Sequence, residues 1–292
     1  MALQLLVNIL VLASIYALLG SGYVLIYRVS RLFNLAHGEL MMFGAYLLLT
    51  TGSMFHHDPL VAVPLALVLS LALGILVYFG LMRWMTGENA LAAMLMTIAL
   101  GIFLRGIVVL FWSASQQYPG SQLGWGNPPI ALPGGARISS ASLALIVTAV
   151  VVFIALYLFL RFTAYGIRMR AAGQNALLAA QRGIGLHGMF ALAWAISTLT
   201  GGAVGMLLSL DSGVDNTMAI IGLKAFPAVL VGGLDSLLGV ILGALIVAAA
   251  EVTIIQYVNP LLSDVVPFFL LLAVLAVRPW GLLGSREQLD RV

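Results

Sequence analysis

Three charged side chains interrupt long apolar runs of this sequence: Arg105, Lys224 and Glu251. A charge is costly in the interior of a membrane, so such groups usually pair with one another or border a path for a polar solute. We hypothesise that these three pair, or that they line an outer vestibule where a zwitterionic or anionic solute arrives. The alternative is that the long side chains extend to the outer membrane surface.

A second polar group lies in the segment Asn34-Leu35-Ala36-His37-Gly38-Glu39, just before a short apolar run. Asn34 is predicted to cap the helix formed by that run. His37 and Glu39 stand at its inner end, as a local hydrogen-bonded cap or as a gate that links the membrane helices to a cytoplasmic loop. These three residues therefore join Arg105, Lys224 and Glu251 as candidates for a translocation path or gate.

The segment 161–188 carries four arginines and no acid: Arg161, Arg168, Arg170 and Arg182. Its middle, residues 174–181, is rich in Ala and Leu and has Asn175 near its start, which predicts one short helix. A basic insert between apolar runs is typical of a cytoplasmic loop. The loop is either a solvated connector or a docking surface for a cytoplasmic partner.

Signatures of catalysis and cofactor binding are missing from the sequence. It has no cysteine, and therefore no disulfide or thiolate metal site, and it has neither a P-loop nor an H-E-x-x-H motif. The glycines Gly183, Gly185 and Gly188 match a dinucleotide fingerprint in spacing, but they follow a basic loop and not a β-strand. We expect no catalytic residue, no metal site and no cofactor in this chain.

Composition sets the class of protein. Of the 292 residues, 62% are hydrophobic and only 8% are charged, and the mean hydropathy is +1.12. Soluble domains contain about 25% charged residues, so this chain is predicted to be a polytopic membrane protein. Its apolar runs lack the alternation of strands and favour helices. The net charge of +3 bears on membrane topology and not on nucleic-acid binding.

The predicted fold is all-α, with residues 1–292 forming a single transmembrane domain. Nine apolar segments are expected, at about residues 5–27, 35–51, 60–82, 90–112, 141–160, 189–210, 218–234, 236–257 and 265–277. The segments near 35–51 and 218–234 are short or broken, and the second either crosses or re-enters, which gives eight or nine transmembrane helices. Residues 113–140, rich in Pro and Gly, form a polar external loop.

Positive charge predicts the orientation. Of the 13 Lys and Arg residues, ten fall on one side of this arrangement, namely Arg28, Arg31, Arg83, Arg161, Arg168, Arg170, Arg182, Arg278, Arg286 and Arg291. The positive-inside rule therefore places the N-terminus outside and the C-terminus inside, with loop 161–188 cytoplasmic.

Two G-x-x-x-G motifs, Gly201/Gly205 and Gly239/Gly243, predict close helix packing within the chain or at a subunit interface.

Several separated motifs resemble one family of membrane proteins. They are the segment Asn34 to Glu39 followed by Met41 to Tyr46; Arg170, Ala171, Asn175, Leu178, Ala179, Gly183 and Ile184; Gly222 to Phe226 with Gly232, Gly233, Ser236 and Glu251; and Arg278 to Gly284. This pattern resembles the branched-chain amino acid ABC transporter permeases of the LivH type and covers nearly the whole chain. The chain departs from the family pattern at Gly173, Arg182 and Asp235.

The resemblance implies a permease subunit of an importer for hydrophobic amino acids or related amides in the bacterial inner membrane. Its implied partners are a second permease in a homo- or heterodimer, two cytoplasmic ATPases that bind ATP and Mg, and an external solute-binding protein. The basic loop would contact the ATPases and pass their movement on through a helix from Arg170 to Ile184. The implied coupling residues are Arg168, Arg170, Ala171, Asn175, Leu178, Ala179, Arg182, Gly183 and Ile184.

Two other kinds of protein are alternatives to the permease. A stand-alone secondary transporter of a small polar or amphipathic solute usually needs intramembrane carboxylates or histidines, and Glu251 is the one acid well inside a predicted span. An intramembrane enzyme would need a nucleophile or metal constellation that the sequence does not suggest. The permease is the favoured interpretation.

Overall fold

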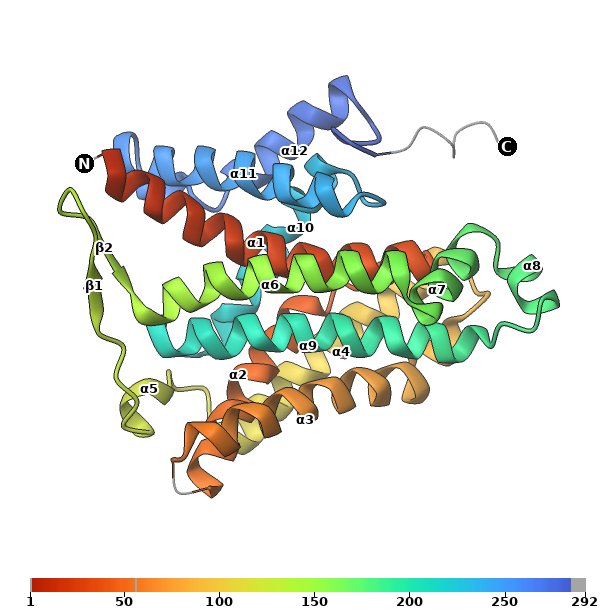
Figure 1. Ribbon diagram of the computed structural model, residues 1–292, viewed down its shortest axis with the longest axis horizontal. Coiled ribbons are helices and arrows are strands. Elements are labelled where there is room, and N and C mark those ends of the chain that lie inside the picture. The colour runs from red at the N-terminus through yellow and green to blue at the C-terminus, as the bar shows by residue number, and fades with distance from the viewer. Residues whose placement is uncertain (1, 56, 285–292) are drawn as a thin grey trace.

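The computed structural model describes residues 2–55 and 57–284, and these fold almost entirely into helices. Arg286 and Arg291, used above to predict the orientation, lie outside this part of the chain. Within these described ranges, six helices are long and apolar enough to cross a membrane. They are α1 (Ala2–Ser30), α3 (Pro59–Gly80), α4 (Ala90–Trp112), α6 (Ser140–Phe162), α9 (Leu186–Ser212) and α11 (Leu237–Tyr257). In Figure 1 the helices α1, α6, α9 and α11 run along the long axis of the bundle.

Three shorter apolar helices coincide with the remaining predicted segments: α2 (His37–Met54), α10 (Ala219–Gly232) and α12 (Val266–Val277). Three short 3₁₀ helices connect to these elements. The first, η1 (Met82–Met85), follows α3, whereas η2 (Asn216–Met218) precedes α10 and η3 (Pro260–Leu262) precedes α12. The two segments predicted to be short or broken, near 35–51 and 218–234, are α2 and α10. Every predicted apolar segment thus forms a helix.

One end of the bundle, here called the hairpin end, holds residues 113–140 (Figure 1). The segment contains α5 (Pro119–Gln122) and two short antiparallel strands, β1 (Pro129–Ala131) and β2 (Arg137–Ser139). The hairpin was not predicted, because runs of Pro and Gly indicated an irregular loop. Gly134 and Gly135 have φ values of 85° and 81°, a left-handed conformation that lets the chain reverse between the strands.

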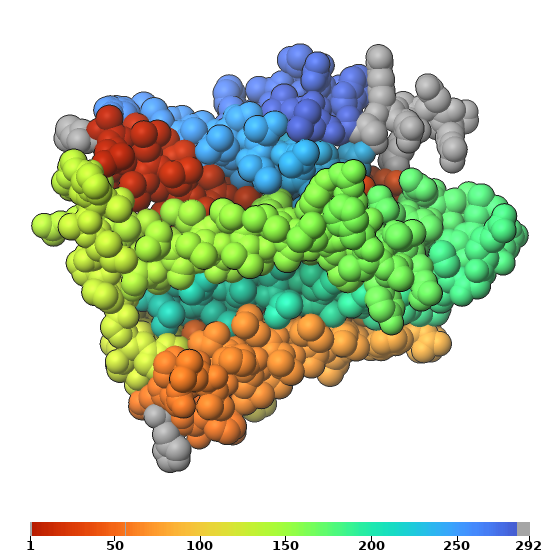
Figure 2. All heavy atoms as spheres, in the orientation of Figure 1, coloured from red at the N-terminus to blue at the C-terminus, as the bar shows by residue number. Residues whose placement is uncertain are grey.

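The opposite end, here called the α8 end, holds α7 (Ala164–Gln174) and α8 (Ala176–Gln181). In Figures 1 and 2, α8 projects beyond the long helices of the bundle, and α7 lies beside the end of α6. The short helix predicted within residues 174–181 is α8, with Asn175 at its start. The longer helix from Arg170 to Ile184 that the family resemblance implied is wrong, because α7 ends at Gln174. Asn175 has an extended backbone and accepts a hydrogen bond from Leu178 N on Oδ1 at 3.0 Å, so it ends α7 and caps α8.

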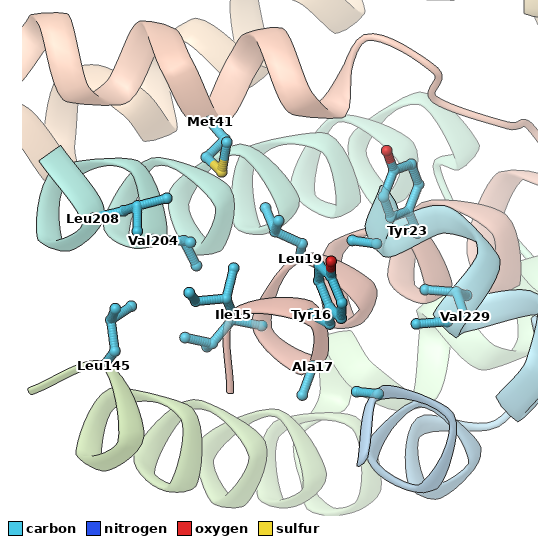
Figure 3. Close-up of a cluster of buried hydrophobic side chains, with 14 of the residues drawn as sticks. Ile15, Tyr16, Ala17, Leu19, Tyr23, Met41, Leu145, Val204, Leu208 and Val229 are labelled. Carbon is cyan, nitrogen blue, oxygen red and sulfur yellow. The ribbon is translucent and has the colours of Figure 1, made fainter. Parts of the chain in front are cut away.

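The main core surrounds α1. Figure 3 shows Ile15, Tyr16 and Leu19 of α1 among side chains of α2, α6, α9 and α10, including Met41, Leu145, Val204, Leu208 and Val229. Tyr16 and Leu19 are almost completely buried, which is the environment expected for a helix surrounded by other helices.

Glycines let several of these helices approach within backbone contact. A Cβ at Gly205 would lie 2.0 Å from the carbonyl oxygen of Met41 on α2, and one at Gly243 would lie 2.1 Å from that of Ala228 on α10. Small residues at such crossings permit close packing of helices in lipid. Both glycines of each G-x-x-x-G motif lie in close contacts within the chain, because a Cβ at Gly201 would lie 3.0 Å from His37 Cε1 and one at Gly239 would lie 2.3 Å from the carbonyl oxygen of Gly232. Packing within the chain was one of the two predicted interpretations.

Candidate functional site

The central feature of the bundle is the start of α2, which lies at mid-depth and not at an end. His37 is fully buried and lies against Gly22 of α1 and Gly201 near the middle of α9. A Cβ at Gly22 would be 2.6 Å from His37 Nε2, and one at Gly201 would be 3.0 Å from Cε1. Ser197 Oγ lies 3.4 Å from Nδ1. Residues 31–36 therefore lead from the α8 end into the middle of the bundle before α2 begins.

The helix α10 starts close to the same point. Gly222 on its first turn meets Gly38 on the first turn of α2, and a Cβ at Gly222 would lie only 2.2 Å from Gly38 Cα. Tyr23 of α1 donates a hydrogen bond to the carbonyl oxygen of Gly222 at 3.0 Å. Two short helices thus begin side by side in the interior, an arrangement that transport proteins use to place helix ends near the middle of the membrane.

Asn34 does not have the predicted role. The N-cap position of α2 is Ala36, no side chain caps the helix, and Asn34 contributes its backbone oxygen, which accepts from His37 N at 3.3 Å. Its side chain is 1% exposed, and neither of its polar atoms has a hydrogen-bond partner among the described residues. His37 Nε2 is likewise buried and unpartnered within that part of the chain. These polar atoms lie close in sequence to the start of α2.

Arg105 pairs with Glu39, which was not predicted. Arg105 on α4 donates to Glu39 Oε1 from Nε at 3.0 Å and from Nη2 at 2.7 Å. The Glu39 side chain is only 11% exposed, whereas that of Arg105 is 46% exposed. A half-exposed arginine within an apolar helix needs water, lipid headgroups or another protein chain beside it, because the hydrocarbon of the membrane would not solvate it.

The other two intramembrane charges pair with each other, as one hypothesis predicted. Lys224 of α10 donates to Glu251 Oε1 of α11, and it also lies 3.2 Å from Asp264 Oδ1. The side chains of Lys224 and Glu251 are 12% and 3% exposed, so neither extends to a surface. Tyr16 of α1 completes the group by donating to Glu251 Oε2 at 2.6 Å. This network joins α1, α10 and α11 near the start of α12.

Tyr16 and Asp264 were missed as members of this network. Tyr16 lies in a mainly apolar stretch, and its hydroxyl group is the feature of the sequence that could have indicated a polar neighbour there. Asp264 resembled a residue of an ordinary turn. Partners separated by 235 residues, as Tyr16 and Glu251 are, give no pattern in the sequence of a single chain.

The predicted coupling residues fall on both helices of the α8 end and on the turn that follows. Arg168, Arg170 and Ala171 lie on α7, Asn175 caps α8, Leu178 and Ala179 lie on α8, and Arg182, Gly183 and Ile184 follow it. Ala179 is buried against the bundle, whereas Leu178 is 56% exposed. Leu177, which the sequence did not single out, is 70% exposed beside it. The outer face of α8 is therefore apolar and uncovered in the single chain.

The helix α7 is fixed to the ends of α1 and α6. A Cβ at Gly173 would lie 1.9 Å from the carbonyl oxygen of Arg28, and one at Gly166 would lie 2.2 Å from that of Phe159. Arg31 Nε donates to the carbonyl oxygen of Gly173 at 3.3 Å. A displacement of α7 would therefore act directly on α1, the helix at the centre of the core.

Comparison with known proteins identifies the family. Residues 5–275 match the family described as the permease component of branched-chain amino acid transport systems. The chain is 30% identical to the high-affinity branched-chain amino acid transport permease BraD of Pseudomonas aeruginosa, over 99% of this chain and 98% of the relative. It is 29% identical to LivH of Salmonella typhimurium, over 99% and 97% of the two chains. A probable LivH of Methanocaldococcus jannaschii is 27% identical, over 94% and 90%.

Each of these similarities covers at least 90% of this chain and of the relative. All three relatives are described as permeases of branched-chain amino acid transport, which favours the permease over a stand-alone secondary transporter. With its apolar helices, this makes the chain a multi-pass membrane protein. The chain belongs to the family of permease components of branched-chain amino acid transport systems.

Proposed function

We propose that this chain is the membrane-spanning subunit of an ABC importer that translocates branched-chain or other hydrophobic amino acids, or related amides. The observation that carries the proposal is the family match over residues 5–275. The α8 end supports it, because it presents an apolar helix to a partner and is joined to the core helix α1 through Gly173 and Arg28.

The proposed orientation has the hairpin end outside the cell and the α8 end in the cytoplasm of a bacterium, across the inner membrane. Arginines gather at the α8 end, including Arg28, Arg31 and Arg161, which agrees with the positive-inside rule. The helices α2 and α10 would each cover part of the membrane thickness, so that eight or nine helices enter the membrane and all described residues form one permease domain.

Coupling to ATP is assigned to α7 and α8. Partner ATPases would bind ATP and Mg and receive the exposed side chains of Leu177 and Leu178 in a groove. Movement of the ATPases would displace α8, and α7 would transmit the displacement to α1 through its contact at Gly173. The extended backbone of Asn175 separates α7 from α8 and would serve as the hinge between them.

The solute path is assigned to the face of α4 that carries Arg105. The Arg105 side chain is half exposed within an apolar helix, which fits a second permease subunit or a water-filled path beside it. Glu39 holds it in place and connects it to the first turn of α2, where the buried polar atoms of Asn34 and His37 stand. Lys224 and Glu251 would brace α10 from the other side of the bundle. The external solute-binding protein would dock at the hairpin end.

The test is purification of the chain from its native membrane, with identification of the proteins that accompany it. Two ATPase chains and a second permease are expected. Leu177→Ser combined with Leu178→Ser should release the ATPases but keep the second permease, because only the outer face of α8 is changed. Trp84→Ser is the matched control, since Trp84 is also 70% exposed but lies on η1. Recovery of the chain alone under cross-linking would contradict the proposal.

A further inference from the structure

A basic pocket of about 500 Å³ lies at the α8 end, between α1, α6, α7 and the start of α11. Arg28, Arg161 and Arg170 line it together with Asp235. Among the described residues that line the pocket, three arginines and one aspartate give an excess of two positive charges, and the space is large enough for a small anionic group. The Nε atom of Arg170 is buried and has no hydrogen-bond partner among the described residues.

An apolar stripe on α6 leads to this pocket. Residues three or four positions apart on a helix share one face, and five such residues of α6 are each about half exposed. They are Val147, Val150, Val151, Ile154 and Leu158. The next position on this face is Arg161, at the pocket. From Arg161 to Val151 the helix rises about 15 Å, which is half the thickness of a bilayer core.

We propose that the pocket binds the phosphate of an anionic phospholipid headgroup, with an acyl chain lying along the apolar stripe of α6. The planar guanidinium group of arginine can donate two parallel hydrogen bonds to a phosphate, and basic pockets between membrane helices bind such headgroups. The combination of excess positive charge and an exposed apolar stripe fits an amphiphile better than a free anion. Bound lipid would join α1, α6 and α7, and would therefore stiffen the support of α8.

The test measures lipid binding to the intact purified chain in detergent, by native mass spectrometry with phosphatidylglycerol and phosphatidylcholine. Phosphatidylglycerol should bind more tightly than phosphatidylcholine. Arg161→Gln should weaken phosphatidylglycerol about tenfold, the effect of losing a hydrogen bond between charged groups. Arg161 is exposed and is expected to tolerate the change, and Arg161→Lys should give an intermediate loss. Arg83→Gln is the matched control: the same charge is removed at the same end, outside the pocket.

Two results with the arginine variants would overturn the proposal, and competition with inorganic phosphate could give a third. One is equal binding of phosphatidylglycerol to the wild type and to the Arg161→Gln and Arg28→Gln variants. The other is an equal loss in the Arg83→Gln variant, which would reveal a general effect of charge. A separate arm adds inorganic phosphate alone: displacement of the lipid at millimolar concentration would assign the pocket to a free anion instead. None of these measurements depends on uptake, so failure here leaves the proposed transport function untouched.

Discussion

Arg105 donates from both Nε and Nη2 to the same carboxylate oxygen of Glu39, and so ties the middle of α4 to the first turn of α2. The two residues are 66 positions apart in the sequence. The pair is asymmetric, because the Glu39 side chain is largely buried whereas Arg105 is half exposed. Loss of the arginine would leave a carboxylate without a partner inside the bundle, whereas loss of the carboxylate would leave an arginine that is half exposed.

The first prediction follows from that asymmetry. Arg105→Gln should lower the free energy of unfolding by roughly 2 kcal/mol, less than the loss for a fully buried pair because solvent screens the exposed partner. Glu39→Gln should cost less, and the double variant should recover most of the loss. Thermal unfolding of the purified chain in detergent measures the stability. If the double variant were no more stable than Arg105→Gln, the claim that Arg105 and Glu39 stabilise each other directly would be contradicted.

The second prediction compares two buried tyrosines. Tyr16→Phe removes the hydrogen bond to Glu251 Oε2 and should cost about 1 kcal/mol of stability. Tyr46→Phe is the matched control, because the Tyr46 hydroxyl is buried and has no partner among the described residues. Its removal should be neutral or stabilising, since an unsatisfied polar group is lost. Equal destabilisation by both changes, measured by thermal unfolding, would argue against the Tyr16–Glu251 bond.

The third prediction concerns the crossing of α2 and α10. Gly222→Ala would place a Cβ 2.2 Å from Gly38 Cα, and backbone atoms cannot easily give way, so a loss of about 1–3 kcal/mol is expected. Gly80→Ala on α3 is the control, because nothing lies within 4 Å of its added Cβ. Alanine there should be neutral or should gain up to about 1 kcal/mol from helix propensity. If Gly222→Ala proved as mild as Gly80→Ala, the two helices would not meet there.

The apolar helices could be predicted from the sequence because lipid imposes a long hydrophobic run on each one. All nine predicted segments correspond to helices. The depth at which α2 begins could not be predicted, since it depends on Gly22 and Gly201, which leave room for His37 between α1 and α9. The predicted capping role of the Asn34 side chain was wrong. The chain enters the bundle before α2 begins, and the backbone oxygen of Asn34, not its side chain, accepts the hydrogen bond from His37 N.

Pairing of the charged residues was predictable only in part. Lys224 and Glu251 both stand in spans at similar predicted depth, and they do pair. Arg105 was grouped with them, but it meets Glu39, whose position before the short helix suggested a place nearer the cytoplasm. The coupling segment was found from its arginines and from Asn175, whereas the division into α7 and α8 depends on the extended backbone of Asn175. The path, gate and coupling roles themselves stay predictions.

The fourth prediction tests the cap of α8. Asn175→Ala removes the acceptor for Leu178 N and should destabilise α8 by about 1 kcal/mol, because a helix of 6 residues has little stability of its own. Hydrogen exchange of residues 176–181 should become about fivefold faster. Asn175→Ser, which keeps a capping oxygen, should exchange nearly as the wild type does. Unchanged exchange in the alanine variant would show that packing of Ala179 alone holds the helix.

The most direct test of the transport function is uptake of labelled leucine by proteoliposomes that contain the chain with its co-purified permease, ATPases and binding protein. Uptake should require ATP on the side of the ATPases and should be lost in the Leu177→Ser/Leu178→Ser variant, while thermal stability of the chain is kept. Uptake that persists without ATP, driven by an ion gradient through this chain alone, would contradict the assignment and would make Glu251 the first residue to change.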